Sequence, residues 1–218
     1  MALVDHWPLV ALRVTTPCLE LRYPDDDVAA ALAQLALGGI HAPDEMPFMT
    51  PWTDAALEDL PRNTLQWFWR TRAELTPTSW HLDLAVVVEG EVVGAQGIEA
   101  KDFAVRRGVG TGSWLGLAHH GKGIGTEMRR AMLHLAFAGL GADFAETEAF
   151  DDNPASLGVT RKLGYEPCGD AIHARREQPA RTLHFRMQRA WWEANLRRDD
   201  VQIDGLEPCL ALLGAAPG

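Results

Sequence analysis

The sequence predicts a mixed α/β protein, of α/β or α+β type, with a mixed sheet flanked by helices. Three observations predict this class. Segments whose apolar residues recur at helical spacing alternate with segments of strand-type residues. Two of the strand-type segments are separated by a tight turn at Gly90, as in a hairpin. A glycine-rich corner at residues 119–125 then leads from another strand-type segment into an amphipathic helix.

The individual elements follow from local signals along the chain. Asp25 to Asp27 provide an N-cap for the first helix, and Pro61 can begin the second. Residues 41–59, between these helices, are rich in Pro and Met, and we expect a loop that borders a substrate site. The expected strands cover residues 10–22, 81–89, 91–100, 111–118, 143–149, 165–176 and 182–189, and the expected helices cover residues 28–37, 61–75 and 126–139, with a short one beginning at 153–154.

Composition and charge argue against several functional classes. The chain carries 30 acidic and 20 basic side chains, a net charge of −10. This disfavours nucleic acid as the main partner, because phosphate binding needs clustered Lys and Arg, and it suits a cationic substrate. No apolar run approaches the roughly 20 residues of a membrane span, and no signal-peptide pattern is seen at the N-terminus. The three cysteines lack disulfide or zinc spacing, so we expect a reducing cytoplasm and no membrane partner.

Residues 1–189 are expected to form one domain and residues 190–218 a C-terminal extension. The extension is apolar but interrupted by Gly and Pro. Packing on its own domain and contact with another subunit are both open. The Trp191-Trp192 pair favours a homo-oligomer over a monomer.

The segment 114–130, WLGLAHHGKGIGTEMRR, is the most informative part of the chain. Gly121, Gly123 and Gly125 permit positive φ angles and let a ligand approach the backbone. Several N–H groups then converge at a helix start, which suits phosphate oxygens. A P-loop fails because Gly123 stands where Ser or Thr should hold magnesium, and a dinucleotide fingerprint fails on spacing and position. A glycine turn that binds no ligand is the remaining alternative.

The loop resembles motif A of the GNAT acyltransferases, Gln/Arg-x-x-Gly-x-Gly/Ala, with His120 in the place of Gln or Arg. Further matches extend the resemblance to about residues 12–189 and indicate the RimJ/RimL branch. The resemblance implies a GNAT-like, mostly antiparallel, twisted sheet of about seven strands flanked by helices, followed by the C-terminal extension. The further matches are Leu19–Arg22, Val93-Gly94 with Gly97, Gly112–Leu115, Asp152–Ser156 and Arg161–Tyr165.

This resemblance implies transfer of an acyl group from coenzyme A to a primary amine of a protein N-terminus or small molecule, by direct attack on the thioester. Acetyl-CoA is the expected co-substrate, succinyl or another acyl group is the alternative, and no metal is needed. A carboxylated acyl group would require a nearby Arg or Lys, which the sequence does not place. A non-catalytic acyl-CoA-binding sensor or assembly module stays open, because His120 and Ser113 depart from the family pattern.

The resemblance also implies roles for side chains in the chemistry. Ser156, three residues after Asn153, is expected to give a proton to the departing thiolate. Glu99 is the expected base toward the amine, and His81 and His119 are alternatives.

A further role falls to the backbone, since an N–H near Leu117 or Ala118 is expected to stabilise the oxyanion. The residues expected to bind the coenzyme are Leu117, Ala118, His120, Gly121, Lys122, Gly123, Ile124, Gly125, Thr126, Asn153, Ser156 and Arg161.

Overall fold

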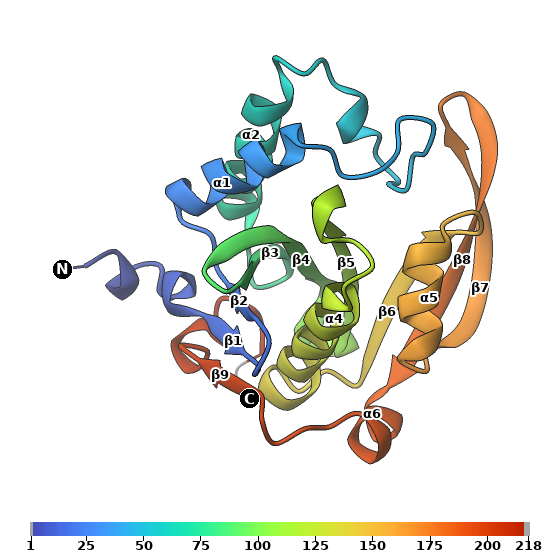
Figure 1. Cartoon of the computed structure of the whole chain (residues 1–218). Coiled ribbons are helices and arrows are strands. Elements are labelled where there is room, and N and C mark those ends of the chain that lie inside the picture. The colour runs from blue at the N-terminus through green and yellow to red at the C-terminus, as the bar shows by residue number, and fades with distance from the viewer. Residues whose placement is uncertain (1, 216–218) are drawn as a thin grey trace.

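The computed structural model describes residues 2–215 and contains one nine-stranded sheet with helices on both faces (Figure 1). The strand order is β7-β8-β6-β5-β4-β3-β2-β1-β9, and within it β5 and β6 form the parallel pair while the other neighbours are antiparallel. The expected mixed, mostly antiparallel sheet is confirmed, with nine strands instead of about seven. The strands are β1 (Arg13–Thr15), β2 (Glu20–Arg22), β3 (Ser79–Val88), β4 (Glu91–Lys101), β5 (Gly108–Leu115), β6 (Phe144–Phe150), β7 (Glu166–Arg175), β8 (Gln178–Gln188) and β9 (Gln202–Asp204).

The helices lie close to their expected positions. Asp25 caps the first helix, because its Oδ1 accepts a hydrogen bond from the Val28 N–H at 2.8 Å. The expected helix over residues 126–139 begins earlier and changes to a π-helix over Leu135–Gly139. The α-helices are α1 (Asp26–Leu37), α2 (Leu60–Glu74), α3 (Phe103–Arg106), α4 (Ile124–His134), α5 (Pro154–Lys162) and α6 (Arg189–Asn195). Within residues 2–215, no helix combines the length and the apolar character needed to cross a bilayer.

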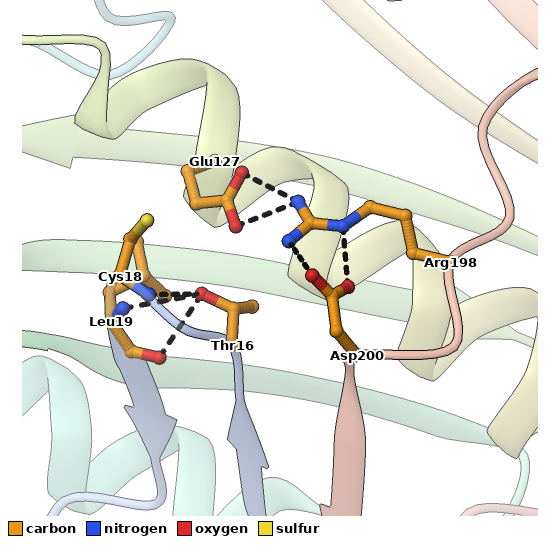
Figure 2. Close-up of polar contacts among 6 residues, drawn as sticks. All are labelled: Thr16, Cys18, Leu19, Glu127, Arg198 and Asp200. Atoms are coloured by element: carbon orange, nitrogen blue, oxygen red, sulfur yellow. Dashed lines mark hydrogen bonds and ion pairs between the residues drawn. The ribbon is translucent and has the colours of Figure 1, made fainter.

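Two strands differ from expectation. The segment 10–22, expected as a strand with an edge or a break at Pro17, turns back after β1, where Thr16 Oγ1 accepts hydrogen bonds from the N–H groups of Cys18 and Leu19, both at 3.2 Å (Figure 2). This turn separates β1 from β2. The strand β9 pairs with β1 and comes from the C-terminal segment, where three residues were too few to give a strand pattern.

The sheet lies between two helical layers. On one face, α1 and α2 cover Ala85 of β3 and Ala95 of β4, and Leu32 and Phe68 pack against them. On the other face, α4 and α5 contribute to the main core (Figure 1), which is filled by residues such as Leu84, Ile98, Met132 and Leu157.

The described part of the C-terminal extension packs on its own domain. Trp192 is buried against Phe137, their ring centroids 5.2 Å apart. Arg198 forms ion pairs with Glu127 of α4 and with Asp200 (Figure 2). These contacts support packing on the domain, and contact of the extension with another subunit stays a prediction. Because Trp192 is used inside the chain, the homo-oligomer stays a prediction without support from this residue.

Candidate active site

The strands β5 and β6 separate after a short parallel contact. They pair only over residues 108–110 and 144–146 of the described sheet. Arg129 of α4 spans the gap beyond: its Nη1 donates to Thr147 Oγ1 at 3.0 Å and its Nη2 to Ser113 Oγ at 3.3 Å. Arg129 is 4% exposed and forms no ion pair with a carboxylate of the described residues. The opening between the strands therefore carries a buried, uncompensated positive charge.

The glycine-rich corner lies at the start of α4, beside this opening. Gly121 and Gly123 have φ angles of 72° and 84°, in the left-handed region where glycine is favoured. The N–H groups of Thr126 and Glu127 donate to the Gly123 carbonyl. By contrast, the N–H groups of residues 121–125 donate to no backbone carbonyl of the described chain outside their own helix. The corner thus offers a set of amides to a phosphate-bearing ligand.

A cavity of about 1030 Å³ joins this corner to the separated strands and to α5. Lys162, which the sequence analysis did not select, also lines it. Eight of the predicted coenzyme residues line the cavity: His120, Gly121, Gly123, Ile124, Gly125, Thr126, Asn153 and Ser156. The other four, Leu117, Ala118, Lys122 and Arg161, do not line it, and their predicted contacts with the coenzyme stay untested.

His120 turns back onto the strand end instead of extending over the loop. Its Nε2 lies 3.1 Å from the Leu115 carbonyl oxygen, which can only accept, so Nε2 carries the hydrogen. Its Nδ1 is then left to contact a ligand. This position lets a histidine stand where the family pattern has Gln or Arg.

Backbone direction shows which amides of β5 face the opening. The Thr111 carbonyl accepts a hydrogen bond from a threonine hydroxyl of β6 at 3.1 Å, so Thr111 directs its backbone polar groups toward β6. These groups alternate along a strand, so the N–H groups of Ser113 and Leu115 point the same way. The Leu117 N–H instead donates to the Gly39 carbonyl at 2.9 Å. The Leu117 N–H is therefore used within the protein, the Ala118 N–H stays a prediction as oxyanion donor, and the Ser113 and Leu115 N–H groups are further candidates.

Ser156 lies in the first turn of α5, on the cavity wall. Asn153 is the N-cap of this helix, and its Oδ1 accepts a hydrogen bond from the Ser156 backbone N–H at 3.0 Å. The cap fixes the Ser156 backbone and does not engage its hydroxyl. The Ser156 hydroxyl is therefore not used by the cap. Its role as proton donor stays a prediction.

Glu99 of β4 belongs to a chain of three ionisable groups. His81 Nδ1 lies 3.0 Å from Glu99 Oε2, and His81 Nε2 lies 3.1 Å from Asp83 Oδ2. The Trp67 N–H donates to the same Asp83 oxygen at 2.6 Å. Burial lowers the pKa of His81, but the charges and hydrogen bonds of Asp83 and Glu99 outweigh it and raise this pKa to about 10. His81 is therefore a cation at neutral pH and an unsuitable base.

The same contacts act on the two carboxyls. The hydrogen bond from His81 lowers the pKa of Glu99 against the opposing effect of burial. Burial raises the pKa of Asp83, but the charge and hydrogen bonds of its partners lower it overall. Both groups are ionised at neutral pH, so the trio carries one net negative charge.

A second hollow, of about 460 Å³, meets the large cavity at this trio. Glu99 and Glu146 line both spaces, and Trp67 and Glu74 of α2 line the smaller one. Glu146 is paired with Arg186 of β8. The junction between the two hollows therefore holds two carboxylates, each with a cationic partner, and Arg70, Lys101 and Arg106 also line the smaller hollow.

The loop over residues 41–59 borders the large cavity, as expected, through residues such as His41 and Phe48. The tip of the β7–β8 hairpin holds it in place: the Arg175 guanidinium donates to the Met46 carbonyl, and Arg176 is paired with Asp54. The loop and the hairpin thus form a continuous rim.

Sequence reasoning missed Arg129 and Asp83. Arg129 follows Met128 in α4, and nothing in the local sequence pattern marks it as buried. Asp83 lies two residues after His81, on the same face of β3, so a paired His and Asp were visible as an alternating pattern.

Free amides at the start of α4, beside the separating strands β5 and β6, form an arrangement suited to a phosphate-bearing ligand. The sequence model of the acetyltransferase (GNAT) domain matches residues 19–166. The chain therefore belongs to the GNAT acetyltransferase family, and it is a GNAT-type N-acyltransferase.

Solved structures show the same fold. RimL, the ribosomal L7/L12 alpha-N-protein acetyltransferase, in complex with coenzyme A, superposes with a TM-score of 0.64 at 19% identity, covering 79% of this chain and 95% of that one. A GNAT family protein from Chromobacterium violaceum gives 0.68 at 20% identity, with 85% and 89% covered. The microcin C7 self-immunity acetyltransferase, in complex with acetyl-CoA and AMP, gives 0.59 at 18% identity, with 79% and 93% covered.

Proposed function

We propose that this protein transfers an acyl group, acetyl in the first place, from coenzyme A to a primary amine by direct attack on the thioester. The observation that carries the proposal is the set of N–H groups over residues 121–125, which donate to no backbone carbonyl outside their helix in the described chain. A diphosphate bound there would direct its pantetheine arm into the opening between β5 and β6. The coenzyme A and acetyl-CoA complexes of RimL and of the microcin C7 enzyme support this donor.

In the proposed reaction, the amine nitrogen forms a bond to the thioester carbon, and the carbonyl oxygen becomes an oxyanion near the Ser113 and Leu115 amides. One such donor contributes about 2.7–4 kcal/mol of transition-state stabilisation. The amine gives up its proton to Glu99, directly or through water. The C–S bond then breaks, and the thiolate takes a proton from Ser156, which solvent restores.

The acceptor is a primary amine of a protein N-terminus or a small cationic molecule, and the Glu99 carboxylate, which lines both hollows, supports this class. An ammonium entering through the smaller hollow would meet the net negative charge of the Asp83–His81–Glu99 trio. The hollow is bordered by α2, which places the acceptor on the face of the sheet opposite α4.

Arg129 favours a second candidate for the acyl group. A carboxylated acyl group, such as succinyl, needs a cation near the thioester, and Arg129 is buried at the opening without a carboxylate partner among the described residues. A buried unpaired charge is costly, so a carboxylate ligand would relieve it. The hydroxyls of Ser113 and Thr147 already orient the guanidinium.

Release of thiol from acetyl-CoA and succinyl-CoA, measured with a panel of amines, tests these proposals. We expect turnover with at least one donor, and Arg129→Met should lower the preference for succinyl-CoA over acetyl-CoA. The mass of coenzyme species retained through purification identifies the donor independently. Binding of both donors without turnover across the panel would favour the non-catalytic sensor, and failure to bind either would remove the proposal.

A further inference from the structure

A cluster of three potential ligands lies on strands β6, β7 and β8, apart from the groups that the proposed reaction uses. Its members are Glu148, His173 and His184, and one ligand atom from each lies within 4.8 Å of the others. Glu148 and His184 are direct partners in the β6–β8 register, and His173 lies on β7, the next strand outward. Three adjacent strands thus bring together side chains that are distant in sequence.

The spacing suits a small divalent cation. His184 Nε2 lies 3.3 Å from Glu148 Oε2. Bonds of about 2.0–2.1 Å in a tetrahedral arrangement separate neighbouring ligand atoms by about 3.3–3.4 Å. His184 Nε2 and Glu148 Oε2 are therefore already at the separation of two ligands of one metal ion. A rotation of the His173 side chain would bring the third ligand to the same separation.

His173 supplies an independent observation. Its Nε2 is buried and has no hydrogen-bond partner among the described residues. Leaving such a nitrogen unsatisfied destabilises the folded protein, and a coordinate bond would remove that cost. His184 Nε2 lies 3.1 Å from the Thr182 hydroxyl, which also donates to the Ala171 carbonyl at 3.4 Å. The hydroxyl therefore keeps a hydrogen-bond partner when His184 Nε2 binds a metal.

The surrounding charges leave the cluster accessible to a cation. The three arginines on these strands are each paired with another carboxylate: Arg175 with Asp152, Arg181 with Asp170 and Arg186 with Glu146. Glu148 is therefore not neutralised by a guanidinium of the described strands. Two imidazoles with one carboxylate match Zn²⁺ and its neighbours in the first transition row, whereas Mg²⁺ and Ca²⁺ prefer oxygen ligands.

We propose that Glu148, His173 and His184 form a Zn²⁺ site, with water as the fourth ligand. The metal ties the β7–β8 hairpin to β6 at the wall of the large cavity, which Glu148 and His184 both line. It also stabilises the β7–β8 hairpin, whose Arg175 and Arg176 contact the loop over residues 41–59. The site is independent of the proposed acyl transfer and does not take part in its chemistry.

Titration of the chelator-treated full chain with Zn²⁺, and with Co²⁺ as a spectroscopic probe, tests the site. We expect one ion per chain, visible bands typical of tetrahedral Co²⁺, and a higher melting temperature with Zn²⁺. His173→Gln and His184→Gln should each weaken Zn²⁺ binding by at least about 100-fold, since even indirect supports of a metal ligand are worth 10–100-fold. His6→Gln, at an exposed histidine far along the chain, is the matched control and should leave binding unchanged.

Two results would overturn the proposal. Binding that survives in the His173→Gln/His184→Gln double variant, or fails in the unmodified protein, would show that the cluster holds no metal. A sulfur-to-cobalt charge-transfer band that disappears in Cys168→Ser would assign the ion to a different ligand set, because Cys168 lines the same cavity. Glu148→Gln keeps the size of the side chain and removes its charge. Loss of Zn²⁺ binding in this variant, with an unchanged melting temperature in the presence of chelator, would show that Glu148 is a ligand and that the variant is still folded.

Discussion

His81 and Glu99 form a hydrogen-bonded ion pair across β3 and β4, with His81 Nδ1 3.0 Å from Glu99 Oε2. Because Asp83 occupies the other ring nitrogen and carboxylates only accept, both nitrogens of His81 must carry hydrogen. Glu99, the expected base, is thus hydrogen-bonded to the His81 cation, which also donates to the Asp83 carboxylate. The proposed base therefore also belongs to an ion pair that affects stability.

The pair gives a stability that depends on pH. The pKa of His81 is raised from 6.5 to about 10, so its contribution is complete below 6.5 and is lost as the pH rises through 10. The pKa values of Asp83 and Glu99 are lowered from 3.8 and 4.5, so their contribution is present above these values and is lost in acid. We expect the difference in free energy of unfolding between the protein and His81→Gln, measured in urea, to be largest near pH 5–6.5 and to vanish above pH 10. A difference independent of pH would contradict this.

Replacement of Glu99 tests the proposed base. Glu99→Gln keeps the size of the side chain and removes its charge, so we expect kcat/KM with amine acceptors to fall by about 100-fold or more. The measurement is steady-state thiol release with saturating acyl donor. A fall carried by the KM for the amine alone would assign Glu99 to binding of the ammonium and not to proton transfer.

The acid limb of the rate profile provides a second reading of the same site. Because the pKa of Glu99 is lowered, its carboxylate is ionised throughout the neutral range. The decline of kcat/KM in acid should therefore follow the pKa of the acceptor. With two acceptors of different amine pKa, the pH at which kcat/KM declines should differ in the same direction as the amine pKa values. The same pH of decline for both acceptors would assign the titration to a group on the protein.

Replacement of Ser156 separates chemistry from folding. The N-cap bond uses the backbone N–H of Ser156, so Ser156→Ala retains it. We expect turnover to fall by roughly 10- to 1000-fold, as for general acids, with no loss of unfolding free energy. Asn153→Ala is the contrasting variant, because it removes the cap and should cost about 0.5–2 kcal/mol of stability. Full turnover in Ser156→Ala with saturating donor would exclude the hydroxyl from the mechanism.

Local patterns were sufficient to predict the central elements. The N-cap at Asp25, the hairpin at Gly90 and the glycine corner before α4 each depend on neighbours in sequence, and each is present. The resemblance to the GNAT pattern supplied the family, and eight of the twelve coenzyme residues that it implied line the cavity.

What escaped prediction depends on contacts between distant segments. The donation from the Leu117 N–H to the Gly39 carbonyl, which removes an expected oxyanion donor, joins residues that are 78 positions apart by number. The burial of Arg129 follows from the separation of β5 and β6, which lets its guanidinium reach the Ser113 hydroxyl on one strand and the Thr147 hydroxyl on the other. Neither arrangement has a signal in local periodicity.

Alanine at the glycine corner tests the phosphate cradle. Gly123 has a φ of 84° and open space around an added Cβ, so Gly123→Ala strains the backbone without a clash. We expect a loss of about 1–2 kcal/mol of stability or a rearranged loop, and weaker binding of coenzyme A by calorimetry. Gly158→Ala, inside α5 and also without a clash, is the control for stability and should gain about 0.5–1 kcal/mol. Equal coenzyme affinity in a folded Gly123→Ala would contradict the cradle.

Gly164 and Trp191 test how the C-terminal extension is joined to the domain. A Cβ on Gly164 would lie 2.2 Å from Trp191 Cη2, and its φ is 78°. Gly164→Ala therefore combines a steric clash with about 1–2 kcal/mol of backbone strain. In a double-mutant cycle with Trp191→Ala, measured by urea unfolding, the cost of Gly164→Ala should fall to the strain alone, because the ring is gone. An equal cost in both backgrounds would mean that the indole does not rest on Gly164.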